Sequence, residues 1–149
     1  MVCYDGDRFH CFGEEQGLPA STWAVAQATT GGPLWVGGMD ALGRFDGHTY
    51  EPIDVEINGY VRRIQSDHQG RIWACTNRDG VLYYKGTQCQ PFTYQDGLPY
   101  PFADAVQVDR EGLIWFATWG GGVGRYDPLS IEKIGTDRHL PDAPSPPSA

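Results

Sequence analysis

The chain has 149 residues and a formal net charge of −8 at pH 7. This length is enough for one domain with a sizeable core. The negative charge argues against nucleic acid, whose phosphates attract Lys and Arg, and against anionic membrane surfaces. The sequence has no run of 18 apolar residues and no secretory leader, so we expect no spanning helix and no membrane contact by this segment.

The N-terminal residues predict two short strands. Val2-Cys3-Tyr4 precedes an Asp5-Gly6 turn, and the apolar-rich stretch 8–12 follows it. A glycine-containing turn between two short runs of this kind is typical of a hairpin. We interpret residues 1–19 as the third and fourth strands of a repeat whose complete copies come later in the chain.

Three tryptophans mark those complete copies. They stand in the phrases Gly32-Pro33-Leu34-Trp35, Gly70-Arg71-Ile72-Trp73 and Gly112-Leu113-Ile114-Trp115, which are 38 and 42 residues apart. A glutamine lies eight residues before each tryptophan: Gln27, Gln65 and Gln107. A period near 40 residues with one bulky anchor in each unit indicates a repeat architecture. We therefore assign these six side chains to the structure of the repeat.

Each copy predicts four short strands. In the third copy the first three are 105–109, 113–118 and 123–126, and the fourth strand is clearest in the second copy, at 90–94. No segment keeps a period of 3.6, so we expect essentially no helix. Four antiparallel strands in about 40 residues describe one blade of a β-propeller. The predicted fold is all-β, with three full blades and an N-terminal half blade.

The predicted propeller segment covers residues 1–136. The half blade 1–19 is followed by blades at about 20–58, 59–99 and 100–136, and the Pro/Ser-rich residues 137–149 predict a disordered tail. A closed propeller needs at least four blades, so the ring of one chain is incomplete. Exposed edge strands invite pairing. The missing blades would come from a longer parent chain or from other copies in a homo-oligomer.

The repeat resembles the two-component regulator propeller family. That family's pattern runs Asp-x-x-Gly-x-Ile-Trp-x-x-Thr, then Gly-Leu-x-Arg-Tyr-Asp, then Asp-Gly-Leu-Pro. Residues 109–118 and 122–127 fit it closely, as do 67–76 and 96–99. The first copy departs, with Thr29 in place of the aspartate and Gly38 in place of the threonine. The resemblance covers residues 1 to about 135.

This resemblance implies a sensory role. Propellers of this family are usually the sensory regions of bacterial membrane-bound hybrid histidine kinases or related regulators. They lie outside the cytoplasmic membrane, often as paired seven-bladed rings, and many respond to carbohydrate fragments. The family thus implies a periplasmic or extracytoplasmic location.

The cysteines and histidines show no metal-binding pattern. Cys3, Cys11, Cys75 and Cys89 have no Cys-x-x-Cys spacing, and the four histidines lie in turns or strand ends. We expect no zinc site, no other metal and no cofactor. Cys3 and Cys11 flank the Asp5-Gly6 turn, so they are either partners in a disulfide or small buried apolar residues.

Positions that differ between the copies are free for function. They gather at the start of the first strand and in the loop after the tryptophan strand, which emerge at the same mouth of a propeller. Trp23 and Phe102 are either exposed there or packed between blades. The candidate ligand-binding residues are Tyr60, Arg62, Arg78, Asp104, Trp119, Asp40 and Tyr100. Aromatic faces beside planar polar groups suit sugar rings.

We therefore predict a non-catalytic propeller that binds a carbohydrate or another small polar ligand. A protein-interaction or self-assembling structural propeller is the alternative. A calcium-dependent lyase or lactonase is a third reading, and it needs carboxylates on several inner strands. Only Asp104 stands at the position that Ala24 and Arg62 hold in the other copies, whereas calcium takes six to eight oxygen ligands.

Overall fold

In the computed structural model, residues 1–129 are described, and they form four antiparallel sheets. A two-stranded sheet of β1 (Val2–Tyr4) and β2 (Phe9–Cys11) comes first. The next sheet holds β3 (Thr22–Gln27), β4 (Leu34–Gly38), β5 (Ala41–Phe45) and β6 (Tyr50–Pro52) in chain order. The third holds β7 (Val61–Ser66), β8 (Ile72–Thr76), β9 (Val81–Lys85) and β10 (Gln88–Phe92). The last contains β11 (Ala103–Val108), β12 (Ile114–Thr118) and β13 (Gly122–Tyr126).

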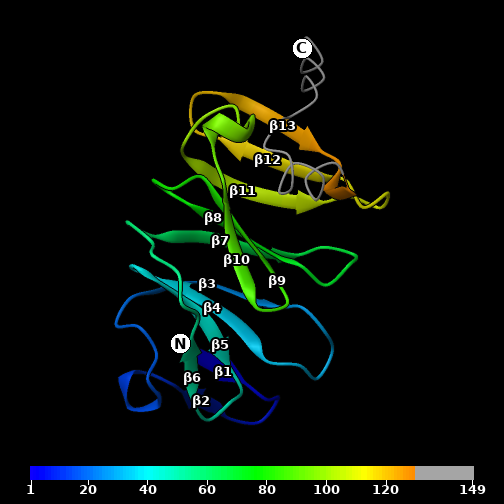
Figure 1. The fold of residues 1–149 in the computed structure, drawn as a ribbon. Coiled ribbons are helices and arrows are strands. Elements are labelled where there is room, and N and C mark those ends of the chain that lie inside the picture. Colours follow the sequence, from blue (N-terminus) through cyan, green and yellow to red (C-terminus); the bar gives the residue numbers. More distant parts are fainter. Residues whose placement is uncertain (130–149) are drawn as a thin grey trace.

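The sheets are propeller blades stacked face to face. Figure 1 shows them following one another in chain order, from β1 and β2 at one end to β13 at the other. The first strands of the three larger sheets are neighbours, with β7 lying between β3 and β11. Within residues 1–129 the sheets do not close into a ring. The all-β, incomplete propeller is thereby confirmed, whereas the predicted tail 137–149 and the fourth strand of the last blade lie outside the described residues.

Two 3-10 turns depart from the expected absence of helix. Both η1 (Glu14–Gln16) and η2 (Tyr94–Asp96) follow the last strand of their sheet. The prediction that the fourth strand reaches residue 94 is therefore wrong, because β10 ends at Phe92. The Asp96 carboxylate accepts a hydrogen bond from the Thr93 backbone N–H at 2.9 Å, which closes the turn and ends the strand.

The tryptophans of the second strands fill the spaces between sheets. Trp35 on β4 is buried, and its ring lies 4.7 Å from that of Tyr84 in the next sheet. Trp73 on β8 is fully buried and lies 5.7 Å from Phe116. Trp115 on β12 is only half-buried, because no sheet within residues 1–129 covers its face. Large aromatic side chains thus supply much of the area that holds the sheets together.

Close approach between sheets also fixes where glycine is needed. A Cβ atom on Gly37 would lie 2.5 Å from Cγ1 of Val61 in the next sheet. One on Gly38 would lie 2.1 Å from the carbonyl oxygen of Ser21. The glycine at position 38, which departs from the family's threonine, is therefore required by the packing of the first blade.

Candidate functional site

The first strands of the three larger sheets share a bulge at the same place. The register shifts between Thr22 and Ala24, between Val61 and Arg63, and between Ala103 and Ala105. The bulged residues are Trp23, Arg62 and Asp104, so the expectation that Ala24 holds the position of Arg62 and Asp104 is wrong. A bulge redirects the side chain that it carries and often lies beside a functional site. Because β3, β7 and β11 are neighbours, these three positions lie along one line at the inner edge of the blades.

Arg62 and Asp104 form an ion pair across two blades. The Nε atom of Arg62 lies 3.3 Å from Oδ1 of Asp104, and their side chains are 48% and 41% exposed. An ion pair this exposed adds only about 0–1 kcal/mol to stability. The pair is thus open to solvent and presents a guanidinium and a carboxylate side by side.

Trp23 and Tyr60 form an aromatic pair next to this line. Their ring centroids are 5.3 Å apart with an interplanar angle of 57°. Trp23 is 58% exposed, whereas Tyr60 is half-buried. The contact joins the first blade to the loop that enters β7, so Trp23 packs between blades and remains exposed as well.

The loop that carries Tyr60 is held by hydrogen bonds from both neighbouring loops. Asp40 donates its backbone N–H to the Gly59 carbonyl at 2.7 Å and accepts the Gly59 N–H on Oδ1 at 2.8 Å. The Tyr60 N–H donates to Oδ1 of Asn77 at 2.6 Å. The Asn58 N–H donates to the carboxylate of Asp79 at 2.6 Å. Asp40 therefore positions the loop, and it adopts a left-handed backbone with φ 51° to do so.

Trp119 and Tyr100 lie together on the third blade. Trp119 follows β12, is 71% exposed, and donates its backbone N–H to the Phe102 carbonyl at 2.9 Å. The ring of Tyr100 lies 5.5 Å from that of the half-buried Phe102. A Cβ atom on Gly121 would lie 2.7 Å from the Pro99 carbonyl oxygen, so the two loops are in close contact. The mouth of this blade thus carries exposed aromatic surface.

Arg78 lines a separate groove on the second blade. The groove has a volume of about 610 Å³ and is also lined by Asp79, Tyr94 and Asn58. Tyr94 is 65% exposed. The sequence analysis placed Asn77 and Asp79 in a variable loop but kept only Arg78 as a candidate, and it missed Tyr94. The position of Tyr94 holds Glu14 in the N-terminal copy, and that variation is the signal that would have found it.

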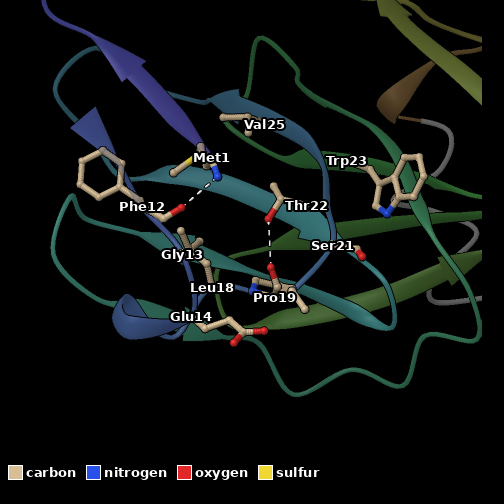
Figure 2. Close-up of a pocket in the computed structure, with 11 residues that line it drawn as sticks. Met1, Phe12, Gly13, Glu14, Leu18, Pro19, Ser21, Thr22, Trp23 and Val25 are labelled. Atoms are coloured by element: carbon tan, nitrogen blue, oxygen red, sulfur yellow. Dashed lines mark hydrogen bonds between the residues drawn. The ribbon is translucent and has the colours of Figure 1, made fainter. Parts of the chain in front are cut away.

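A further groove lies beside the N-terminal hairpin. Figure 2 shows its lining, which comes from β3 and from the residues on either side of η1. Its volume is about 550 Å³, and Met1, Phe12, Leu18 and Val25 contribute the apolar part. The N-terminal amino group donates a hydrogen bond to the Phe12 carbonyl at 2.9 Å and fixes the start of the chain there.

The cysteines of the hairpin are free thiols. Cys3 lies opposite His10, and Cys11 lies opposite Val2. Since neighbouring residues of a strand point to opposite faces, this register places the two thiols on different faces of the hairpin. The structure therefore favours two separate thiols over a disulfide, and because both cysteines are exposed, the alternative expectation of small buried residues is wrong.

Within residues 1–129, no three His, Cys, Asp or Glu side chains lie close enough together to hold a metal ion. In the same part of the chain, no helix has the length and apolar character needed to cross a membrane.

Comparison with protein families gives one match, to the family described as two component regulator propeller, over residues 56–78. These residues include the loop with Tyr60, the strands β7 and β8 and the loop with Arg78. Residues 56–78 match the model of this repeat. The resemblance seen in the sequence is thus confirmed. Among curated proteins, none matches the chain in sequence.

Solved structures share the fold. The extracellular domain described as that of hybrid two component system BT3049 from B. thetaiotaomicron is 20% identical, with a TM-score of 0.71 over 80% of this chain and 19% of that one. The corresponding domain of BT4673 from the same organism is 20% identical, with a TM-score of 0.61 over 71% of this chain and 15% of that one. A virginiamycin B lyase from Staphylococcus aureus is 16% identical, with a TM-score of 0.64 over 82% of this chain and 42% of that one. The chain thus spans about a fifth or less of the two regulator domains.

Proposed function

We propose that the chain is a non-catalytic, ligand-binding segment of a sensory propeller in a two-component type of regulator, located outside the cytoplasm. The observation that carries the proposal is the Arg62–Asp104 ion pair beside the Trp23–Tyr60 ring pair. The regulator propeller repeat at 56–78 and the fold shared with extracellular domains of regulators support the sensory role.

The ligand we propose is a carbohydrate or another small polar molecule. A guanidinium presents a rigid fork of donors, and a carboxylate presents two acceptors. Side by side, Arg62 and Asp104 offer both to neighbouring hydroxyl groups. The exposed indole of Trp23 adds an apolar face against which a sugar ring stacks. Few, well-placed polar groups next to aromatic surface are typical of small-molecule sites.

Binding without catalysis fits the bulged residues. Of Trp23, Arg62 and Asp104, only Asp104 is a carboxylate, and Arg62 pairs with it. General acid and base chemistry on a glycoside takes two carboxylates that flank the bond. The fold shared with the virginiamycin B lyase, at 16% identity, is evidence for the architecture alone.

The test is calorimetry with a panel of oligosaccharides. Arg62→Ala and Trp23→Ala should each weaken the binding of any oligosaccharide that binds the native protein. We expect a loss of about tenfold or more in affinity, which corresponds to roughly 1.4 kcal/mol. Arg110→Ala is the matched control, because Arg110 is exposed in the turn after β11, at the strand end away from the bulge. No binding by any oligosaccharide, or equal weakening by Arg62→Ala and Arg110→Ala, would contradict the proposal.

A further inference from the structure

The N-terminal hairpin is equivalent to the outer half of the second blade. Residues 1–19 align with residues 81–99 at a constant offset of 80, without a gap. Identical positions include Tyr4 and Tyr84, Gly6 and Gly86, Phe12 and Phe92, and the two Gly-Leu-Pro triplets. The structures agree, since β1, β2 and η1 correspond to β9, β10 and η2. The hairpin β1–β2 therefore occupies the third and fourth strand positions of a blade.

The first two strand positions of that blade are empty in residues 1–129. β9 pairs with β8 on one edge and with β10 on the other. β1 pairs only with β2, so its other edge has no partner strand in this part of the chain. The groove of about 550 Å³ in Figure 2 lies beside that hairpin, between it and β3.

Exposed apolar residues lie on both sides of the half blade: Val2 and Phe9 on the face away from β3, and Val25 of β3 against the groove. Val2 is 61% exposed, whereas its equivalent Leu82 is 3% exposed. Phe9 is 73% exposed, whereas its equivalent Cys89 is half-buried. On β3, Val25 is 46% exposed, although Ile64 and Val106, which hold the same place in the strand pairing of the other two blades, are each 8% exposed. The same positions that are buried between complete blades are thus uncovered here.

The other face of the hairpin already packs as a blade does. Met1, Phe12 and Leu18 contact the core around Val36 and Phe45. Their equivalents Val81, Phe92 and Leu98 pack in the same way against the third blade. The hairpin therefore packs on the next sheet as the third and fourth strands of a blade do. Within residues 1–129, that blade lacks its first and second strands.

We propose that the free edge of β1, together with the adjoining groove and the exposed Val25, binds a two-stranded β-hairpin equivalent to the first and second strands of the repeat, supplied by a propeller repeat outside residues 1–149. The second strand of that hairpin adds to the free edge of β1. Backbone hydrogen bonds along an edge strand give affinity in this mode of recognition, and alternate side chains give specificity.

The register of the complex follows from the second blade. There Ile72 lies opposite Tyr84, and Ala74 lies opposite Leu82. By the same pairing, Tyr4 faces the residue equivalent to Ile72, and Val2 faces the residue equivalent to Ala74. The tryptophan of the incoming phrase then lies opposite Cys3, as Trp73 lies opposite Tyr83.

A separate repeat fits better than a second copy of this chain. The hairpins of this type within residues 1–129 are β3–β4, β7–β8 and β11–β12, and each is already paired with its own third strand. A second copy would have to break the strand pairing within one of its sheets to donate one. The similar regulator domains are also several times longer than this chain, which covers 19% and 15% of them.

The test uses the full chain and a synthetic peptide with residues 60–77 of this protein, in which Cys75→Ser prevents oxidation. Calorimetry should show binding at a ratio of one peptide to one chain. Val25→Lys places a charge in the groove and should weaken binding by about tenfold or more. Val123→Lys is the control, because Val123 is 50% exposed on β13, in the last sheet. It should change the affinity less than about twofold, as expected for a site distant from the interface.

Three results would overturn the proposal. One is the absence of binding at every soluble concentration of the peptide. Another is equal weakening by Val25→Lys and Val123→Lys. The third comes from sedimentation of the chain alone: a dimer that Val25→Lys dissociates would show that a second copy covers this face. The proposal rests on the blade geometry and not on the proposed ligand, so a failure of oligosaccharide binding leaves it unchanged.

Discussion

The carboxylate of Asp67 accepts a hydrogen bond from the indole Nε1 of Trp73 at 2.9 Å. Asp109 and Trp115 repeat this contact at 2.8 Å. The same aspartates cap their own turns, since Asp67 accepts the Gln69 N–H at 2.8 Å. The constant spacing between the aspartate and the tryptophan in the repeat thus has a physical cause. One carboxylate accepts hydrogen bonds from the turn and from the indole N–H of the tryptophan that packs between blades.

Replacing Asp67 with alanine should destabilise the protein strongly. Asp67 is buried, and it also accepts a hydrogen bond from Nε of the buried Arg71 at 2.6 Å. Removing one partner of a buried ion pair costs about 3–5 kcal/mol, because the remaining charge stays buried. Urea unfolding should show this loss for Asp67→Ala.

Asp109→Ala is the matched comparison for that substitution. Asp109 keeps the contact with Trp115, but it is half-buried and has leucine, not arginine, four residues further on. Its loss should cost clearly less than the loss of Asp67, because solvent reaches the half-buried carboxylate and no buried arginine is left without its partner. Equal losses from the two substitutions would contradict the assignment of the larger effect to the buried Arg71.

The same aspartate should make the protein sensitive to acid. Burial alone would raise the pKa of Asp67, but the hydrogen bonds from Trp73 and Arg71 outweigh it and hold the pKa below its ordinary value. A depressed pKa in the folded state adds stability at a pH above the unfolded value, and this stability is lost as the pH falls through the folded pKa. The urea midpoint of the native protein should therefore fall steeply below about pH 4, near the ordinary pKa of a carboxyl group.

Asp67→Asn provides the check on that pH dependence. It removes the titrating group, so the difference between the urea midpoints at neutral and acid pH should shrink. Asp54→Asn is the control, because Asp54 is exposed in the loop after β6. If Asp54→Asn reduced the pH dependence as much as Asp67→Asn, the acid sensitivity would not come from the buried aspartate.

Much of the fold follows from the sequence, because each blade repeats the constraints that build it. The tryptophan spacing, the turn glycines and the Gly-Leu-Pro loops predict the four-strand unit without any long-range information. The bulges were not predictable in this way. Trp23, Arg62 and Asp104 have no residue type in common, so nothing local marks the shift of register that brings them into line.

The candidate site was predictable only as a set of positions. Variation between copies identified Arg62 and Asp104, but their ion pair depends on how two blades stack. Asp40 also varies between copies, and the structure shows it holding Gly59 in place. Comparison of the copies separates positions that build every blade from positions that differ between blades. It does not separate ligand contacts from contacts that adapt one loop to its neighbour.

Replacing Gly37 with valine should separate the first two large blades. Any Cβ at this position would meet Cβ of Val61 at 2.6 Å, and Val61 is fully buried. Overpacking of a close contact costs about 1–3 kcal/mol. Gly13→Ala is the control, because Gly13 has a negative φ of −156° and no atom lies within 4 Å of an added Cβ. Thermal unfolding should show a clear loss for Gly37→Val and a small change for Gly13→Ala, and the reverse order would contradict the packing.

The four cysteines should react with a thiol reagent in three steps. Cys3 and Cys11 are exposed and free, so both should react quickly. Burial raises the pKa of Cys89 to about 11, which lowers the thiolate fraction at pH 8 and slows its reaction. Cys75 is fully buried and its pKa is raised further by burial, so it should react only after denaturation.

A time course with Ellman's reagent at pH 8, with and without guanidinium, measures all three steps. Cys3→Ser and Cys11→Ser should each remove one fast thiol and leave the slow ones unchanged. The free thiols would be disproved if neither fast thiol appeared until a reductant was added, because that result requires a disulfide between Cys3 and Cys11. Such a bond would also need a register different from the pairing of Cys3 with His10, since that pairing points the two sulfur atoms to opposite faces.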